Sequence, residues 1–147
     1  MIVIFSTMTG ISLSVDLKKK CDTAQLLCKF ADEVALLMDF KLTSTGDILR
    51  HIGQDERFSS LQFVKSYDME KKTPVKTNLD KTDDRELASF LAELGTTDIE
   101  NQLRLVKAYK AFAESRKNHF QKEYEKRRKL YTAFGVSGGL VLALMLA

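Results

Sequence analysis

The charged residues of this chain are confined to its middle. All of them lie between Asp16 and Lys129 of the 147 residues, and an uncharged apolar segment stands at each end. As a helix, the C-terminal segment Leu130 to Ala147 would extend about 27 Å at 1.5 Å per residue. That length is close to the roughly 30 Å hydrocarbon thickness of a bilayer. The sequence therefore predicts a C-terminal transmembrane helix over residues 130–147.

The N-terminal apolar segment, residues 1–15, is shorter and carries five hydroxyl side chains. It would extend roughly 22 Å as a helix, which is short for a span. Its basic residues follow the apolar part, whereas a cleaved signal peptide carries positive charge ahead of it. We expect a short uncleaved transmembrane anchor. An alternative is that Met1 is an internal methionine of a longer chain, in which case further membrane residues precede it.

Each apolar end has a basic cluster at its inner edge. The two clusters are Lys18, Lys19 and Lys20, and Lys126, Arg127, Arg128 and Lys129. Because Lys and Arg accumulate on the cytoplasmic side of membrane segments, both clusters place residues 16–129 in the cytoplasm. The prediction is a protein of the cell membrane, two-pass or at least C-terminally anchored. The clusters also suit contact with anionic headgroups, although a role in setting topology is the simpler interpretation.

The central region, residues 16–129, is long enough for one domain with one modest core. A seam of alternating four- and three-residue spacing predicts a long helix after the first anchor. Its members are Leu17, Cys21, Ala24, Cys28, Ala31, Ala35 and Met38. No alternation of strand type is present, so the fold class predicted is an all-α membrane-anchored helical bundle.

Further helices follow along the chain. We expect a short helix capped by Thr43, Ser44 or Thr45 and ended by Gly53, then a helix within residues 54–70 and an exposed connection over residues 71–82. Two apparent capping boxes open the next helices. They pair Asp83 with Glu86 and Thr97 with Glu100. The second box begins an apolar face that continues without Pro or Gly to Gly135, which predicts one helix running from the domain into the membrane.

The sequence contains no motif that would carry catalysis, a cofactor or a metal. We therefore expect no enzyme activity, no small-molecule substrate and no nucleic-acid partner. Cys21 and Cys28 lie too far apart along one helix face for a disulfide, and they should remain thiols. Gly135 and Gly139, with Gly138 beside them, could pack a partner helix in the membrane, or they could be ordinary membrane-helix composition.

Two segments together carry a family resemblance. The first is Leu94 to Gln102 (LGTTDIENQ), with Leu94, Gly95, Asp98 and Gln102 at its marked positions, and the second is the terminal KLYTAFGVSGGLVLALMLA. With the apolar N-terminus and the helical domain, they resemble the stage III sporulation protein AB family. In that family these four residues mark the start of the last long helix.

The resemblance implies a non-enzymatic membrane component of the sporulation channel between mother cell and forespore. It also implies a domain similar to the F-family platform proteins of type II secretion, placed in the mother-cell cytoplasm. The implied partners are the membrane, the stage III sporulation protein AA ATPase and other subunits of the same operon. Alternatives are a platform protein of a secretion or pilus system unrelated to sporulation, or a membrane-bound enzyme or sensor.

Overall fold

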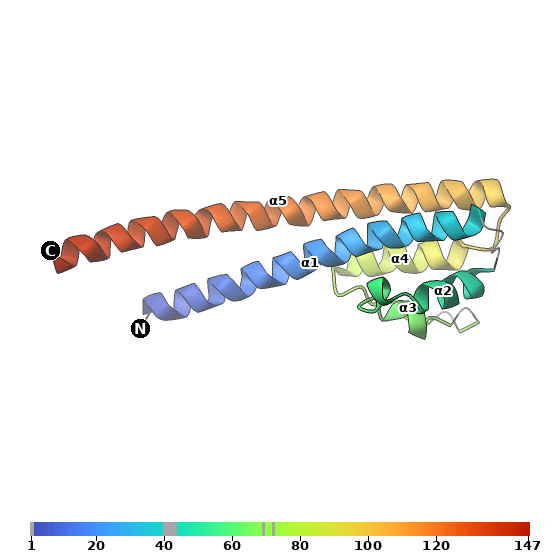
Figure 1. Cartoon of the computed structure of the whole chain (residues 1–147), viewed down its shortest axis with the longest axis horizontal. Helices are drawn as coiled ribbons and strands as arrows, with labels where there is room; N and C mark the ends of the chain where they lie inside the picture. The colour runs from blue at the N-terminus through green and yellow to red at the C-terminus, as the bar shows by residue number, and fades with distance from the viewer. Residues whose placement is uncertain (1, 40–43, 69, 72) are drawn as a thin grey trace.

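Two long antiparallel helices form the axis of the molecule (Figure 1). The computed structural model describes residues 2–39, 44–68, 70–71 and 73–147, with side chains from residue 15 onward. Within these residues the chain is helical without a strand, which confirms the all-α class. The elements are α1 (Ile2–Asp39), α2 (Thr45–Gly53), the 3-10 turn η1 (Glu56–Phe58), α3 (Phe63–Ser66), α4 (Lys81–Glu93) and α5 (Ile99–Leu146).

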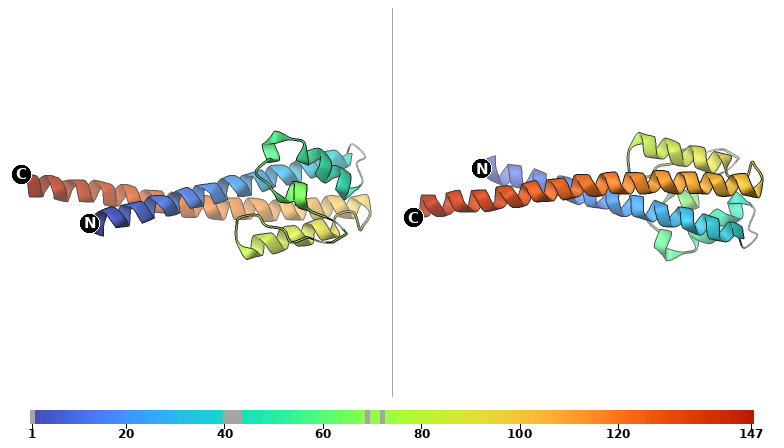
Figure 2. Two further views of the ribbon diagram at one scale, coloured as in Figure 1. Left: turned by 90° about the horizontal axis from the view of Figure 1, so that it is seen from below. Right: turned by 90° about the horizontal axis from the view of Figure 1, so that it is seen from above.

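The small elements gather at one end of this axis. Figures 1 and 2 show α2, α3 and α4 beside the end of α1 and the start of α5, while both chain termini lie at the other end. An ion pair of 2.6 Å between Lys110 Nζ and Asp32 Oδ1 joins the two long helices. The chain thus consists of a bundle with two helical extensions that leave it in the same direction.

The core lies where α1 and α5 meet the shorter helices. Phe30 of α1 is fully buried, and its ring packs edge-on against Phe58 and Phe63, with centroid distances of 6.5 and 5.3 Å. The seam predicted for α1 is largely confirmed, because most of its members are buried: Ala24, Cys28, Ala31 and Met38. Cys21 and Cys28 are both free thiols, as expected.

The prediction of one helix within residues 54–70 is wrong. The chain instead makes η1, a turn and the four-residue α3. Asp55 caps the start of η1, because its carboxylate accepts the backbone N–H of Arg57 at 2.9 Å and also binds the Arg57 guanidinium. Leu61 and Phe63 are both buried, and their two-residue spacing cannot lie on one face of a helix.

The boundaries expected for the next segments are also partly wrong. Residues 71–82 are not simply an exposed connection, because Val75 and Thr77 are buried and α4 already begins at Lys81. The capping box lies one turn earlier than expected, with Asp80 as the N-cap and Asp83 as its partner. The N-caps of the neighbouring helices are Ser44 for α2 and Asp98, rather than Thr97, for α5.

The last helix contains the membrane candidate. α5 runs for 48 residues, and among the residues searched it alone is long and apolar enough to cross a bilayer; its apolar segment is not buried in the protein. The side chains of residues 1–14 are not described, so the N-terminal transmembrane anchor expected over residues 1–15 is not confirmed. The domain boundaries at residues 15 and 130 stay predictions.

Candidate functional site: two junctions on the last helix

The turn between α4 and α5 is built by the four residues of the sequence motif. Leu94 is buried and ends α4, and Gly95 adopts a left-handed φ of 87° that turns the chain toward α5. Thr45 of α2 donates a buried hydrogen bond of 2.9 Å from its Oγ1 to the Leu94 carbonyl. The turn is therefore docked onto α2, and only a residue without Cβ suits position 95.

Asp98 and Gln102 complete this turn from the α5 side. The backbone N–H of Gln102 donates to the Asp98 carbonyl at 3.0 Å as the first bond of the helix. The Gln102 side chain is buried, and its amide donates to the Thr97 carbonyl at 2.7 Å. The motif thus satisfies backbone groups that the turn would otherwise leave without partners. We call this turn, residues 94–102, the corner.

A second junction holds the other end of α4. Arg116 of α5 forms a forked pair with Asp83, with Nε to Oδ1 at 2.7 Å and Nη2 to Oδ2 at 3.0 Å. The same Nη2 binds Asp80 Oδ2 at 2.7 Å. The side chain of Asp83 is only 2% exposed, so its charge depends on Arg116 for compensation. The hydrogen bonds to Asp83 raise the pKa of Arg116.

A lysine of α1 also contacts this junction of Arg116 with Asp80 and Asp83. Lys20 Nζ lies 3.6 Å from Asp80 Oδ1, and the buried ring of Phe120 lies beneath two cations. The Arg116 guanidinium carbon is 4.8 Å and Lys20 Nζ 5.7 Å from the ring centroid, within the range of cation–π attraction. We call this cluster of Lys20, Asp80, Asp83, Arg116 and Phe120 the clamp, because it joins α1, α4 and α5.

Between the two junctions, α4 rests on α5 through a stacked aromatic pair. The rings of Phe90 and Tyr109 are nearly parallel, with centroids 4.5 Å apart. Burial, and secondarily the negative charge of Asp83, raises the pKa of Tyr109, so its hydroxyl stays protonated. Burial also raises the pKa of the Cys28 thiol. These groups pack as neutral side chains.

The clamp was missed in the sequence because Asp83 was interpreted only as a helix cap. A signal for it is present in α5, where the buried residues Ala113 and Phe120 continue the apolar face on either side of Arg116. A long cation on such a face requires a buried acidic partner. The sequence could not say which helix would supply that partner.

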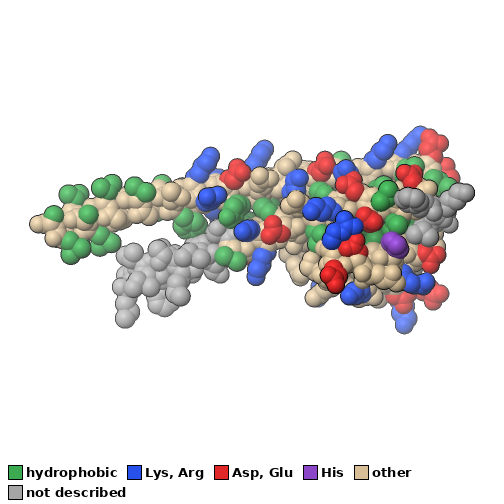
Figure 3. All heavy atoms as spheres, viewed as in Figure 1, with side chains coloured by type: hydrophobic (Ala, Val, Ile, Leu, Met, Phe, Trp, Pro, Cys, Tyr) green, Lys and Arg blue, Asp and Glu red, His purple; other side chains and the backbone are tan. Residues whose placement is uncertain are grey.

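The two basic clusters lie within about 9 Å of each other along the paired helices. Lys20 of the first cluster reaches Phe120, six residues before the second cluster begins at Lys126. Space-filling spheres in Figure 3 show basic side chains where the two extensions leave the bundle. We call this level the neck.

The three glycines in the apolar end of α5 have no protein neighbour among the described residues. A Cβ built on Gly135, Gly138 or Gly139 would meet nothing within 4 Å. Their packing against a partner helix stays a prediction, and the small residues of the N-terminal segment lie outside the described side chains.

The described residues contain no group of three or more His, Cys, Asp or Glu side chains placed to hold a metal ion. His51 and His119 are both exposed. The expectations of no catalytic residue, no cofactor and no metal stay predictions.

Comparison with known families identifies the chain. The family model of stage III sporulation protein AB matches residues 68–147, which is more than half of the sequence. The chain belongs to the stage III sporulation protein AB family. It is therefore a sporulation-related protein, and the matched range includes the corner, the α4 and α5 residues of the clamp, and the apolar end of α5. No curated protein and no solved structure matches the chain.

Proposed function

We propose that this protein is a non-catalytic membrane scaffold of the sporulation channel between mother cell and forespore. It couples a cytoplasmic secretion-type ATPase to membrane subunits of the same operon. Family membership supports the sporulation role, and the continuity of α5 supports the coupling role. A single helix that includes both junctions and the membrane candidate is the observation that carries the proposal.

The geometry of α5 suits transmission of force. Its 48 residues extend about 72 Å at 1.5 Å per residue, with the clamp about 25 Å from its start. Neither Pro nor Gly lies between Ile99 and Phe134, so the sequence contains none of the usual causes of a kink there. Displacement of the corner would therefore move the membrane segment as part of one stiff element.

The proposal places the bundle in the mother-cell cytoplasm, and selective labelling tests that placement. In a chain whose native cysteines are replaced by serine, Thr82→Cys adds an exposed thiol near the neck. An impermeant maleimide should leave it unlabelled in intact cells and label it after permeabilisation. The matched Ala147→Cys variant should be labelled already in intact cells, because the proposal places residue 147 across the membrane. Ready labelling of Thr82→Cys in intact cells would contradict the orientation.

Binding to the ATPase tests the coupling itself. The corner lies at the end of the bundle farthest from the chain termini (Figure 1), and Ile99 within it is 56% exposed despite its apolar side chain. We expect the full chain in detergent to bind the operon's ATPase, and Ile99→Asp to weaken binding at least about tenfold, or 1.4 kcal/mol. Surface-immobilised ATPase would give the dissociation constants.

The matched control is Ser89→Asp, an exposed position on α4 outside the corner. It should bind as the wild type does. If the wild-type chain shows no binding, the coupling role is wrong. If both variants bind equally well, the contact lies elsewhere on the bundle.

A further inference from the structure

The charge of the molecule is unevenly distributed along its axis. Three segments meet at the neck: residues 16–23, 76–85 and 116–129. Together they contain thirteen basic and seven acidic residues, a net charge of +6, whereas the whole chain carries +3. The rest of the chain is therefore net negative. The positive end of the bundle is the end from which the proposed membrane segment leaves.

The acidic side chains of segment 76–85 are engaged within the protein. Asp80 and Asp83 bind Arg116, and Asp84 accepts hydrogen bonds from the backbone and hydroxyl of Thr77 at 2.7 and 2.6 Å. By contrast, several exposed neck lysines form no ion pair among the described residues. They are Lys18, Lys19, Lys76 and Lys81. These lysines leave an uncompensated positive surface.

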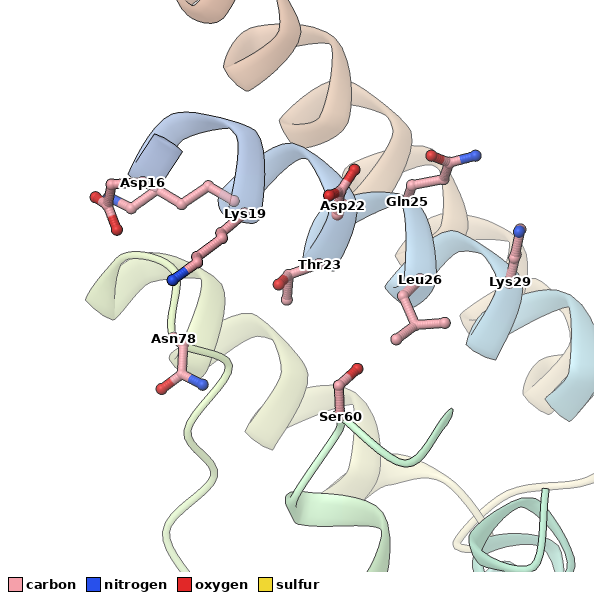
Figure 4. A pocket seen from close by; sticks show the side chains of 10 residues that line it. Asp16, Lys19, Asp22, Thr23, Gln25, Leu26, Lys29, Ser60 and Asn78 are labelled. Atoms are coloured by element: carbon pink, nitrogen blue, oxygen red, sulfur yellow. The ribbon is translucent and has the colours of Figure 1, made fainter. Parts of the chain in front are cut away.

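A cleft opens beside one of these lysines, Lys19. It has a volume of about 540 Å³, and its lining includes Lys19, Thr23, Ser60 and Asn78. Figure 4 shows the Lys19 side chain extending from α1 toward Asn78, while Thr23 and Ser60 lie farther along the cleft. Ammonium, amide and hydroxyl groups here can all donate hydrogen bonds to phosphate oxygens. Two carboxylates, Asp16 and Asp22, also line the cleft and reduce its positive potential.

The mouth of the cleft lies near the headgroup layer of the expected bilayer. The Lys20–Asp80 contact places the loop before α4 at the level of Lys20, and Lys20 lies against Phe120, ten residues before the apolar segment of α5 begins at Leu130. Ten helical residues correspond to about 15 Å. The interfacial layer on each side of the hydrocarbon is about 5–8 Å thick. The loop before α4 would therefore lie about 7–10 Å outside the headgroup layer, which is within about one Debye length at physiological ionic strength.

We propose that the positive surface of the neck, with the exposed Lys19, Lys76 and Lys81, binds anionic phospholipid headgroups of the bilayer that anchors α5. The bound headgroups would hold the bundle against the membrane and fix its tilt. This role differs from topology determination, because Lys76 and Lys81 lie far in sequence from both apolar ends. The inference rests on the membrane placement in the proposed function.

Energy transfer from a tryptophan to labelled lipid tests this contact. The chain has no tryptophan, so Thr82→Trp, an exposed position at the start of α4, provides a single reporter. The full chain is reconstituted in vesicles of phosphatidylcholine or phosphatidylglycerol, each with a trace of dansyl-labelled headgroup. We expect at least twofold greater transfer in phosphatidylglycerol, and high salt should remove the difference.

Charge variants identify the residues responsible. In the reporter chain, Lys76→Gln with Lys81→Gln should abolish the lipid difference, and the corresponding arginine pair should retain it. The matched control, Lys65→Gln with Lys107→Gln, removes two exposed lysines outside the neck and should have no effect. Asp16→Asn should increase transfer in phosphatidylglycerol. Circular dichroism would verify that each variant is folded.

The outcomes separate this inference from the membrane placement. Equal transfer in the two lipids, or equal loss in the control pair, would overturn the headgroup site while leaving the anchor intact. Release of the protein from vesicles by an alkaline carbonate wash would show that α5 is not anchored, and both proposals would then fail.

Discussion

Replacing Arg116 with leucine is expected to lower the free energy of unfolding by about 3–5 kcal/mol, because it leaves a buried carboxylate uncompensated. Asp83 is 2% exposed and would lose both hydrogen bonds from the guanidinium. The side chain of Arg116 is itself 21% exposed, so some water can enter and the lower end of that range is expected. Urea unfolding of the full chain in detergent, followed by circular dichroism, would measure the loss.

An exposed pair on the same helix provides the control. Arg104 binds Glu100 at 2.9 Å, but both side chains are more than 70% exposed. Arg104→Leu should therefore cost no more than about 0.5 kcal/mol. Equal losses for the two variants would show that the clamp adds no more than a surface ion pair.

A double variant tests the physical reason for the loss. Adding Asp83→Asn to Arg116→Leu removes the buried charge while keeping an oxygen that can accept the Asp80 N–H bond, which is 3.1 Å in the native chain. The double variant should be more stable than Arg116→Leu alone, because the penalty comes from the unpaired charge. If the double variant is the less stable of the two, lost packing rather than charge explains the effect.

Replacing Gly95 with alanine is expected to destabilise the protein by about 2–4 kcal/mol, since left-handed backbone alone costs an L-residue about 1–2 kcal/mol. The added Cβ would also lie 2.7 Å from Thr45 Oγ1, a contact too short to tolerate. Movement of Thr45 would lengthen its buried hydrogen bond to Leu94. The same unfolding measurement applies.

Gly53→Ala is the matched control at another helix end. Its Cβ would meet only side-chain atoms of Val64 and Lys65, at 3.6 and 3.7 Å, and its φ is not left-handed. It should be neutral, or stabilising by up to about 1 kcal/mol. Thr45→Ala should cost less in the Gly95→Ala background than in the wild type, because it removes the clashing oxygen. Simple additivity of the two variants would argue against the contact.

Some features were predictable because they depend on local pattern. The seam from Ala24 to Met38 and the apolar face around Tyr109 predicted the two long helices. Ile99 fits the apolar spacing of that face but is 56% exposed, since it lies before the first full turn of α5. Between Gln54 and Glu70, the local apolar spacing wrongly predicted one helix, because the buried apolar residues of this segment reach the core from different turns of the chain.

The sequence by itself determined the helical class, the confinement of the charged residues to the middle of the chain, and the apolar C-terminal segment. These follow from residue spacing and from where charges are absent, which tertiary contacts cannot change. Only the tertiary structure decided that Asp83 meets Arg116 and that Thr45 docks the corner. Those pairs are 33 and 49 residues apart, and such partners are selected by how the helices pack rather than by any local preference.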